Sequence, residues 1–181
     1  MCKNHNLALL TKTCQIYLLY FDHLKGLIPI LIFSNEFNKK NEEQIVPIKF
    51  HPIIHLYSEN EKTFEHINLI YNGKVYFAKR LKIKNVGKIF IILVLTKEFN
   101  VYGSDLLNIC TNLIKKRFGY SLNEVIASEF LNENLIKSPK LLKIIKKGEI
   151  IKEDIRNQLK KVWENYFESI VFSYEKNQLN F

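Results

Sequence analysis

Glycine and cysteine are scarce in this sequence, and their scarcity argues against several classes of protein. The chain has six glycines in 181 residues, and no two of them have the spacing of a loop that cradles phosphate groups. Its three cysteines, Cys2, Cys14 and Cys110, form neither a Cys-x-x-Cys pair nor a zinc-binding pattern. We therefore expect no glycine-rich nucleotide site and no structural zinc, and the odd number of cysteines fits a reducing compartment.

Long apolar runs are also missing. The longest, Ile89–Leu95, has about seven residues, whereas a membrane-spanning helix needs roughly 20. The N-terminal residues lack the apolar stretch and cleavage site of a secretion signal, and Cys2 stands where myristoylation would need glycine. We expect a cytoplasmic protein, either soluble or bound at the periphery of a membrane.

No catalytic constellation is visible in the sequence. The Gly-x-Ser-x-Gly nucleophile elbow is absent. His51 and His55 are four residues apart, but Pro52 between them opposes a helix, and in a strand they would lie about 13 Å apart. We expect no catalytic residue, no cofactor and no metal, so the protein is not expected to be an enzyme. A hydrolase that uses Cys14 or the histidines is the remaining enzymatic alternative.

The net charge of +9 comes from the middle of the chain. Residues 73–152 hold sixteen basic and six acidic side chains, whereas residues 1–72 hold seven of each. Three groups of cations stand out: Lys74, Arg80, Lys82 and Lys84 on one face of an expected strand, Lys115 to Arg117 at a helix end, and Lys140, Lys143, Lys146, Lys147 and Lys152 around Gly148. This basic surface predicts, as an alternative function, binding to nucleic acid or to an anionic membrane. An ordinary solvated surface is the competing interpretation.

Strand patterns occupy the first half of the chain and helical patterns the second, which predicts an α/β (α+β) domain. The runs Ile16–Phe21, Leu27–Phe33 and Ile89–Leu95 are apolar throughout, as in strands that are buried on both faces. The pair Asn72-Gly73 predicts a type I′ hairpin turn. That turn would pair Tyr71 with Lys74, Leu69 with Tyr76 and Ile67 with Ala78. Both faces of this hairpin are then apolar, so either a bulge shifts its register or a three-layer α-β-α arrangement covers it.

Helix signals follow in the second half. Ser104 is expected to cap a helix that runs to Phe118, with Gly119 just past its end, and the pattern from Ser121 to Glu124 matches a capping box. Ser138-Pro139 predicts the start of a short helix that Gly148 closes. A longer amphipathic helix is expected from Ile151. We divide the chain into a flanking segment (1–13), an α/β domain (14–135) and a helical extension that packs on it (136–181).

The segment from residue 45 to residue 57 is harder to assign. Pro47 and Pro52 exclude one regular helix through it, because each lacks an amide donor. An irregular extended stretch is favoured, and a short helix is the alternative.

Three segments resemble the longin-like family: IYLLYFDHLKGLIPILIF (16–33), HINLIYNGKVYFAKRLKI (66–83) and KIFIILVLTKEFNVYGSDLLNICTNLIKKRFG (88–119). The resemblance covers about residues 14–118 and is to the archaeal longin-like proteins associated with Ras-like small GTPases in particular. It implies a three-layer α-β-α sandwich. Its mostly antiparallel sheet would have about five strands, with one connecting segment on one face and two helices on the other.

Longin-like domains are generally not enzymes. They pair with one another or with roadblock-type relatives and bind small GTPases or trafficking proteins. The resemblance therefore implies an adaptor with a role in vesicle trafficking or GTPase regulation, as a homo- or heterodimer.

The apolar stripe of the last helix offers the sharpest prediction about a binding surface. The side formed by Val162 and Tyr166 is expected to pack on the sheet, and Trp163 or Phe167 to lie nearer the margin, where exposed aromatics anchor partners. The candidate binding residues are thus of two kinds, basic and aromatic: Lys74, Arg80, Lys82, Lys84, Lys143, Lys146, Lys147, Trp163 and Phe167.

Overall fold

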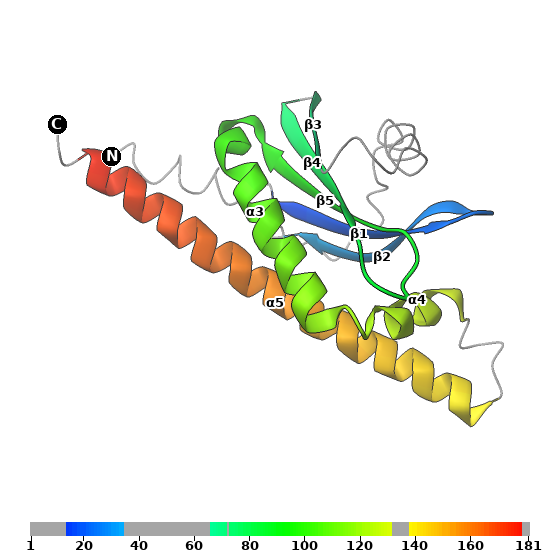
Figure 1. Ribbon diagram of the computed structural model, residues 1–181. Helices are drawn as coiled ribbons and strands as arrows, with labels where there is room; N and C mark the ends of the chain where they lie inside the picture. Colours follow the sequence, from blue (N-terminus) through cyan, green and yellow to red (C-terminus); the bar gives the residue numbers. More distant parts are fainter. Residues whose placement is uncertain (1–13, 35–65, 72, 132–137, 179–181) are drawn as a thin grey trace.

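The computed structural model describes residues 14–34, 66–71, 73–131 and 138–178 (Figure 1). It has five strands, β1 (Gln15–Asp22), β2 (Gly26–Ser34), β3 (His66–Tyr71), β4 (Lys74–Leu81) and β5 (Ile89–Thr96). A 3-10 turn, η2 (Lys97–Phe99), leads into α3 (Asn100–Leu113), the π-helical turn η3 (Ile114–Phe118), α4 (Leu122–Phe130) and α5 (Pro139–Gln178). The predicted α+β class, with an antiparallel five-stranded sheet and a helical C-terminal half, is confirmed.

The sheet has the strand order β2-β1-β5-β4-β3, and all neighbouring strands are antiparallel. β5 lies at its centre, and its residues from Ile89 to Leu95 are all buried. Such a strand has an apolar side chain at every position because both of its faces are covered. The β3–β4 hairpin has the predicted register, with Tyr71 opposite Lys74 and Leu69 opposite Tyr76.

A β-bulge marks the first hairpin. Leu18 pairs with Leu31 while Leu19 pairs with Pro29, so Ile30 is the extra residue. A bulge lets two consecutive residues turn inward, and Ile30 and Leu31 are both buried. Pro29, which has no amide hydrogen to donate, stands beside the bulge on an edge strand, where proline is tolerated.

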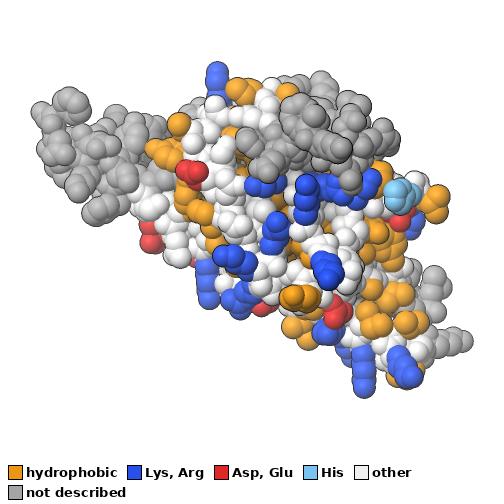
Figure 2. Space-filling model, in the orientation of Figure 1, with side chains coloured by type: hydrophobic (Ala, Val, Ile, Leu, Met, Phe, Trp, Pro, Cys, Tyr) orange, Lys and Arg blue, Asp and Glu red, His pale blue; other side chains and the backbone are white. Residues whose placement is uncertain are grey.

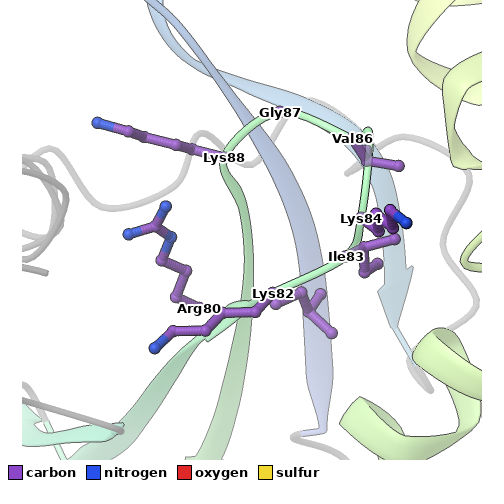
Figure 3. Close-up of a pocket in the computed structure, with 8 residues that line it drawn as sticks. Arg80, Lys82, Ile83, Lys84, Val86, Gly87 and Lys88 are labelled. Atoms are coloured by element: carbon purple, nitrogen blue, oxygen red, sulfur yellow. The ribbon is translucent and has the colours of Figure 1, made fainter.

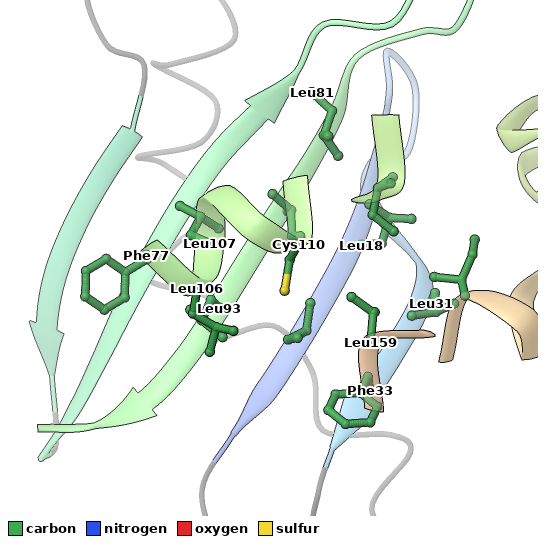
Figure 4. Close-up of a cluster of buried hydrophobic side chains, with 14 of the residues drawn as sticks. Leu18, Leu31, Phe33, Phe77, Leu81, Leu93, Leu106, Leu107, Cys110 and Leu159 are labelled. Atoms are coloured by element: carbon green, nitrogen blue, oxygen red, sulfur yellow. The ribbon is translucent and has the colours of Figure 1, made fainter. Parts of the chain in front are cut away.

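One face of the sheet packs against the helices (Figure 4). Buried side chains of α3 meet buried side chains of β4 and β5, and α5 packs against β2 through residues that include Leu159. Figure 4 shows the members of this core: Leu18, Leu31, Phe33, Phe77, Leu81, Leu93, Leu106, Leu107, Cys110 and Leu159. α5 therefore lies along the domain and contributes to its main core.

The opposite face of the sheet is also buried. Its cluster consists of Tyr17, Leu19, Phe21, Tyr76, Ala78, Phe90, Ile92 and Val94. The two-sided apolar pattern predicted for the hairpin is thus confirmed. The connecting segment expected on this face falls within residues 35–65, including the segment with Pro47 and Pro52, and lies outside the described residues.

Two predicted helix starts need correction. α3 begins at Asn100, four residues before Ser104, and Ser104 lies exposed within the helix. Ser121 does precede α4, but its side chain makes no capping hydrogen bond. The Glu124 carboxylate, which a capping box would direct back to Ser121, instead accepts a hydrogen bond from Lys147 Nζ at 2.7 Å. A contact between helices has replaced the local one.

Gly148 does not end a helix, contrary to the prediction. α5 runs through it without a break for 40 residues. A Cβ atom at position 148 would lie 2.5 Å from Ser128 Cβ and 2.7 Å from the Glu124 carbonyl oxygen. The missing side chain therefore lets α5 approach α4 closely, and the glycine serves helix packing rather than termination.

Candidate functional site

The connection between β4 and β5 forms an open hollow of about 430 Å³ that is lined by basic side chains (Figure 3). Arg80, Lys82, Lys84 and Lys88 line it. In Figure 3 the side chains of Arg80, Lys82 and Lys88 extend to the same side of the connection, and Lys84 extends away from them. Arg80 and Lys88 both make further interactions within the chain, so we do not assign an anion site to the hollow.

This geometry corrects the cationic strand face predicted from the sequence. β4 ends at Leu81, so Lys82 and Lys84 follow the strand instead of belonging to it. Lys74 and Arg80 do lie on the same face by strand alternation. They are six positions apart, however, which corresponds to about 20 Å along an extended strand. The prediction that these four cations share one face of a strand is therefore wrong.

Sequence reasoning missed Lys88 as a member of this basic group. Its Nζ lies 5.6 Å from the centroid of the Phe21 ring, on the face of the sheet opposite the helices. Strand alternation backward from Phe90 could have placed it there, because residues two apart in a strand share a face.

A second basic group lies on the first turns of α5. Lys140, Lys143 and Lys146 are exposed, and none of them takes part in an ion pair within the described residues. Lys147 pairs with Glu124 at 2.7 Å. Lys152, counted with this group from the sequence, is buried and donates hydrogen bonds to Glu129 and Glu149. It joins α4 to α5 and is not part of the surface.

Trp163 of α5 is buried, which corrects the prediction that it could be an exposed anchor for a partner. Trp163 is only 6% exposed and belongs to the main core, where its ring centroid lies 6.3 Å from that of Phe99. Phe167, Val162 and Tyr166 are half-buried against the same core. Trp163 therefore points inward, while Phe167 is the residue nearer the margin.

The tip of the β1–β2 hairpin presents an apolar side chain to solvent. Leu24 is 96% exposed, in a turn that Asp22 stabilises by accepting hydrogen bonds from the amides of Leu24 and Lys25. These two hydrogen bonds lower the pKa of the Asp22 carboxyl. The adjacent Lys25 Nζ lies 5.1 Å from the centroid of Phe130, at the end of α4. The hairpin tip and α4 thus form one surface.

Burial makes Cys14 and Cys110 poor nucleophiles. Cys14 and Cys110 are both buried, and burial raises the pKa of the Cys110 thiol to about 12 and that of Cys14 well above its usual value. A thiolate, the reactive form, is therefore strongly disfavoured at neutral pH. His51 and His55 lie outside the described residues. Within the described ranges there is no group of three side chains arranged to hold a metal ion.

This burial predicts the reactivity of the two thiols. In a Cys2→Ser variant at pH 8, we expect Cys110 to react with an aromatic disulfide reagent about a thousandfold more slowly in the folded protein than in urea, because a pKa of about 12 replaces one near 8.5. Cys14, whose pKa is also raised by burial, should likewise react more slowly in the folded protein than in urea. A thiol that reacts in the native protein as fast as in urea would contradict the buried arrangement.

The same pKa shift has a consequence for stability. The pKa of the Cys110 thiol is higher in the folded protein than in the unfolded chain. Ionisation of this thiol therefore leaves the free energy of unfolding unchanged below about pH 8.5 and lowers it as the pH rises from there toward the folded pKa of about 12.

No protein-family model matches the chain, and a search of curated proteins finds no match either. Among the helices described, none combines the length and apolar composition needed to cross a membrane.

Proposed function

We propose that this chain is a non-enzymatic, longin-like adaptor that binds a small Ras-like GTPase or a second longin or roadblock-type subunit. The observation that carries the proposal is the arrangement of its elements. Two β-hairpins flank a central fifth strand, and that strand leads directly into a helix packed on one face of the sheet. The resemblance implied a mostly antiparallel sheet of about five strands with helices on one face, and the observed sheet and helices support the proposal in that respect. Longin-like domains act by presenting surfaces to partners.

The edge of β3 that faces away from β4 supports a protein partner. β3 pairs with β4 on one side, and no described strand pairs with its other side. Its Ile70 side chain is 52% exposed and Asn68 is exposed as well. An open strand edge can accept a strand from a partner through backbone hydrogen bonds. An interface centred there would need to bury roughly 1,200–2,000 Å² to be stable.

The experiment is a pull-down with purified partners. The full chain is immobilised and offered small GTPases loaded with GDP or a GTP analogue, and longin and roadblock-type subunits, while light scattering reports self-association. We expect retention of one of these classes. Ile70→Asp should weaken that binding at least about tenfold, as truncation of an interface anchor does.

Leu24→Asp is the matched control, since it alters an exposed apolar residue in the turn between β1 and β2, which lie at the other end of the sheet from β3. A strictly monomeric protein that retains none of these partners would overturn the proposal. Equal loss of binding in both variants would remove the β3 edge from it.

A further inference from the structure

Three separate segments bring exposed leucines and lysines to one end of the molecule. The tip of the β1–β2 hairpin, α4 and the N-terminal end of α5 lie at the same end in Figure 1. We call this surface the lysine–leucine end, and define it by Leu24, Lys25, Phe130, Lys140, Leu141, Lys143 and Lys146. The space-filling view shows orange and blue side chains side by side there (Figure 2).

Contacts between the segments hold this end together. Phe130 of α4 packs edge-on against Tyr20 of β1, with ring centroids 5.9 Å apart, and Lys25 lies over the same ring. α4 is joined to α5 by the pair Glu124–Lys147 and by the close approach at Gly148. The three segments therefore present their side chains in a fixed arrangement.

The charge of this end is positive. Lys140, Lys143 and Lys146 are exposed and unpaired within the described residues. Of the carboxylates in the β1–β2 turn, in α4 and in α5 up to Glu149, Asp22 accepts hydrogen bonds from backbone amides, Glu124 pairs with Lys147, and Glu129 and Glu149 pair with Lys152.

Helix stability does not explain these lysines. The first turn of α5 has no acidic residue, and lysines near a helix N-terminus are disfavoured by the helix dipole. Lys140, which lies in that first turn, adds its positive charge to that of the helix end. Lys143 and Lys146 lie beyond the first turn, where the dipole has little effect, and contribute their own charges alone.

The apolar side chains of this end are exposed as well. Leu24 is 96% exposed, Phe130 39% and Leu141 37%. Exposed apolar residues beside lysines fit the boundary between phospholipid headgroups and acyl chains, where the apolar part enters and the lysines stay at the phosphates. We propose that the lysine–leucine end binds the surface of an anionic phospholipid bilayer. This inference does not depend on the adaptor function, because it uses no residue of β3.

The residue types favour lipid over nucleic acid. Leu24 and Leu141 have no aromatic face on which a base could stack, and Phe130 already contacts Tyr20 and Lys25. All cations of the lysine–leucine end are lysines, which attract phosphate as point charges without the two-pronged contact that arginine makes. A lipid surface uses both kinds of residue, because the lysines are attracted to its phosphates and the leucines can insert among its acyl chains.

Co-sedimentation with vesicles tests the proposal. The full chain is mixed with vesicles of phosphatidylcholine alone, or with 30% phosphatidylserine, at low and at high salt. We expect binding to the anionic vesicles only, and weaker binding at high salt. Each lysine near such a surface contributes about fivefold, so Lys140, Lys143 and Lys146 changed together to Gln should lower binding about a hundredfold. Leu24→Asp and Leu141→Asp should lower it further.

The control variants make the same types of substitution, Lys to Gln and apolar to Asp, at exposed positions outside the lysine–leucine end. Lys97, Lys116 and Lys161 changed together to Gln, and Val101→Asp, alter exposed residues outside the lysine–leucine end and should leave vesicle binding within about twofold. All of these sites are exposed, so the melting temperature should change little.

Several results would overturn the proposal. They are no binding to anionic vesicles at low salt, equal losses in the control variants, or binding to a labelled duplex or single strand but not to vesicles. The last result would assign the lysines to nucleic acid instead. Failure of the GTPase pull-down with intact vesicle binding would overturn only the adaptor function.

Discussion

Trp163→Ala should lower the free energy of unfolding by about 3–5 kcal/mol, as truncation of a buried tryptophan does. The Trp163 ring packs between Phe99 and Phe167, with centroid distances of 6.3 and 5.7 Å, and is almost fully enclosed. Its removal would leave a cavity where α5 meets the segment that leads into α3. Urea unfolding followed by circular dichroism at 222 nm measures the loss.

Phe167→Ala provides the comparison. Phe167 is half-buried, so its truncation should be clearly milder than that of Trp163. If Trp163→Ala left stability unchanged and instead abolished binding to a partner, the burial seen here would be wrong for the protein in solution, and Trp163 would be an interface anchor after all.

Gly103→Ala should destabilise the protein by about 1–3 kcal/mol, the usual effect of overpacking a core. A Cβ atom at this position would lie 2.0 Å from Phe77 Cε2, and the Phe77 ring is itself completely buried. The sign of the change in stability is informative, because helix propensity alone would make alanine more stable than glycine by about 1 kcal/mol. A loss of stability therefore reports the clash with Phe77. Thermal and urea unfolding of the single variant are sufficient to measure it.

Two further variants isolate the cause. Ser104→Ala changes an exposed neighbour in the same helix and should be neutral or slightly stabilising. Gly103→Ala combined with Phe77→Leu should lose less than the sum of the two single changes, because the smaller side chain gives space to the new methyl group. A Gly103→Ala variant more stable than the parent would show that α3 can move away from the sheet.

The sheet was predictable from the sequence because its signals are local. Asn72-Gly73 determines the turn geometry, and the turn determines every pair along β3 and β4. The uninterrupted apolar residues of β5 likewise indicated burial on both faces before any neighbour was known.

Two of the errors involve contacts between residues distant in sequence, and a third is local. Gly148 has the local character of a helix end, and only its closeness to Ser128 shows why a glycine is needed inside α5. Trp163 stands beside the expected apolar stripe in sequence, and only its contact with Phe99, 64 positions earlier, shows that it is buried. The prediction of a cationic strand face was wrong because strand alternation was extended past Leu81, where β4 ends.

The position of β5 has a consequence for how the chain acquires its structure. β1 and β2 are joined by a tight turn, as are β3 and β4, so each hairpin can form from neighbouring residues alone. The two hairpins never pair with each other; β5 lies between them and pairs with both β1 and β4. During synthesis, the two hairpins cannot join into one sheet until Ile89–Thr96 has left the ribosome. Because pairing between residues distant in sequence is slow, the docking of this one strand is the step that should limit folding, and substitutions in β5 should slow folding more than equally destabilising ones in β3.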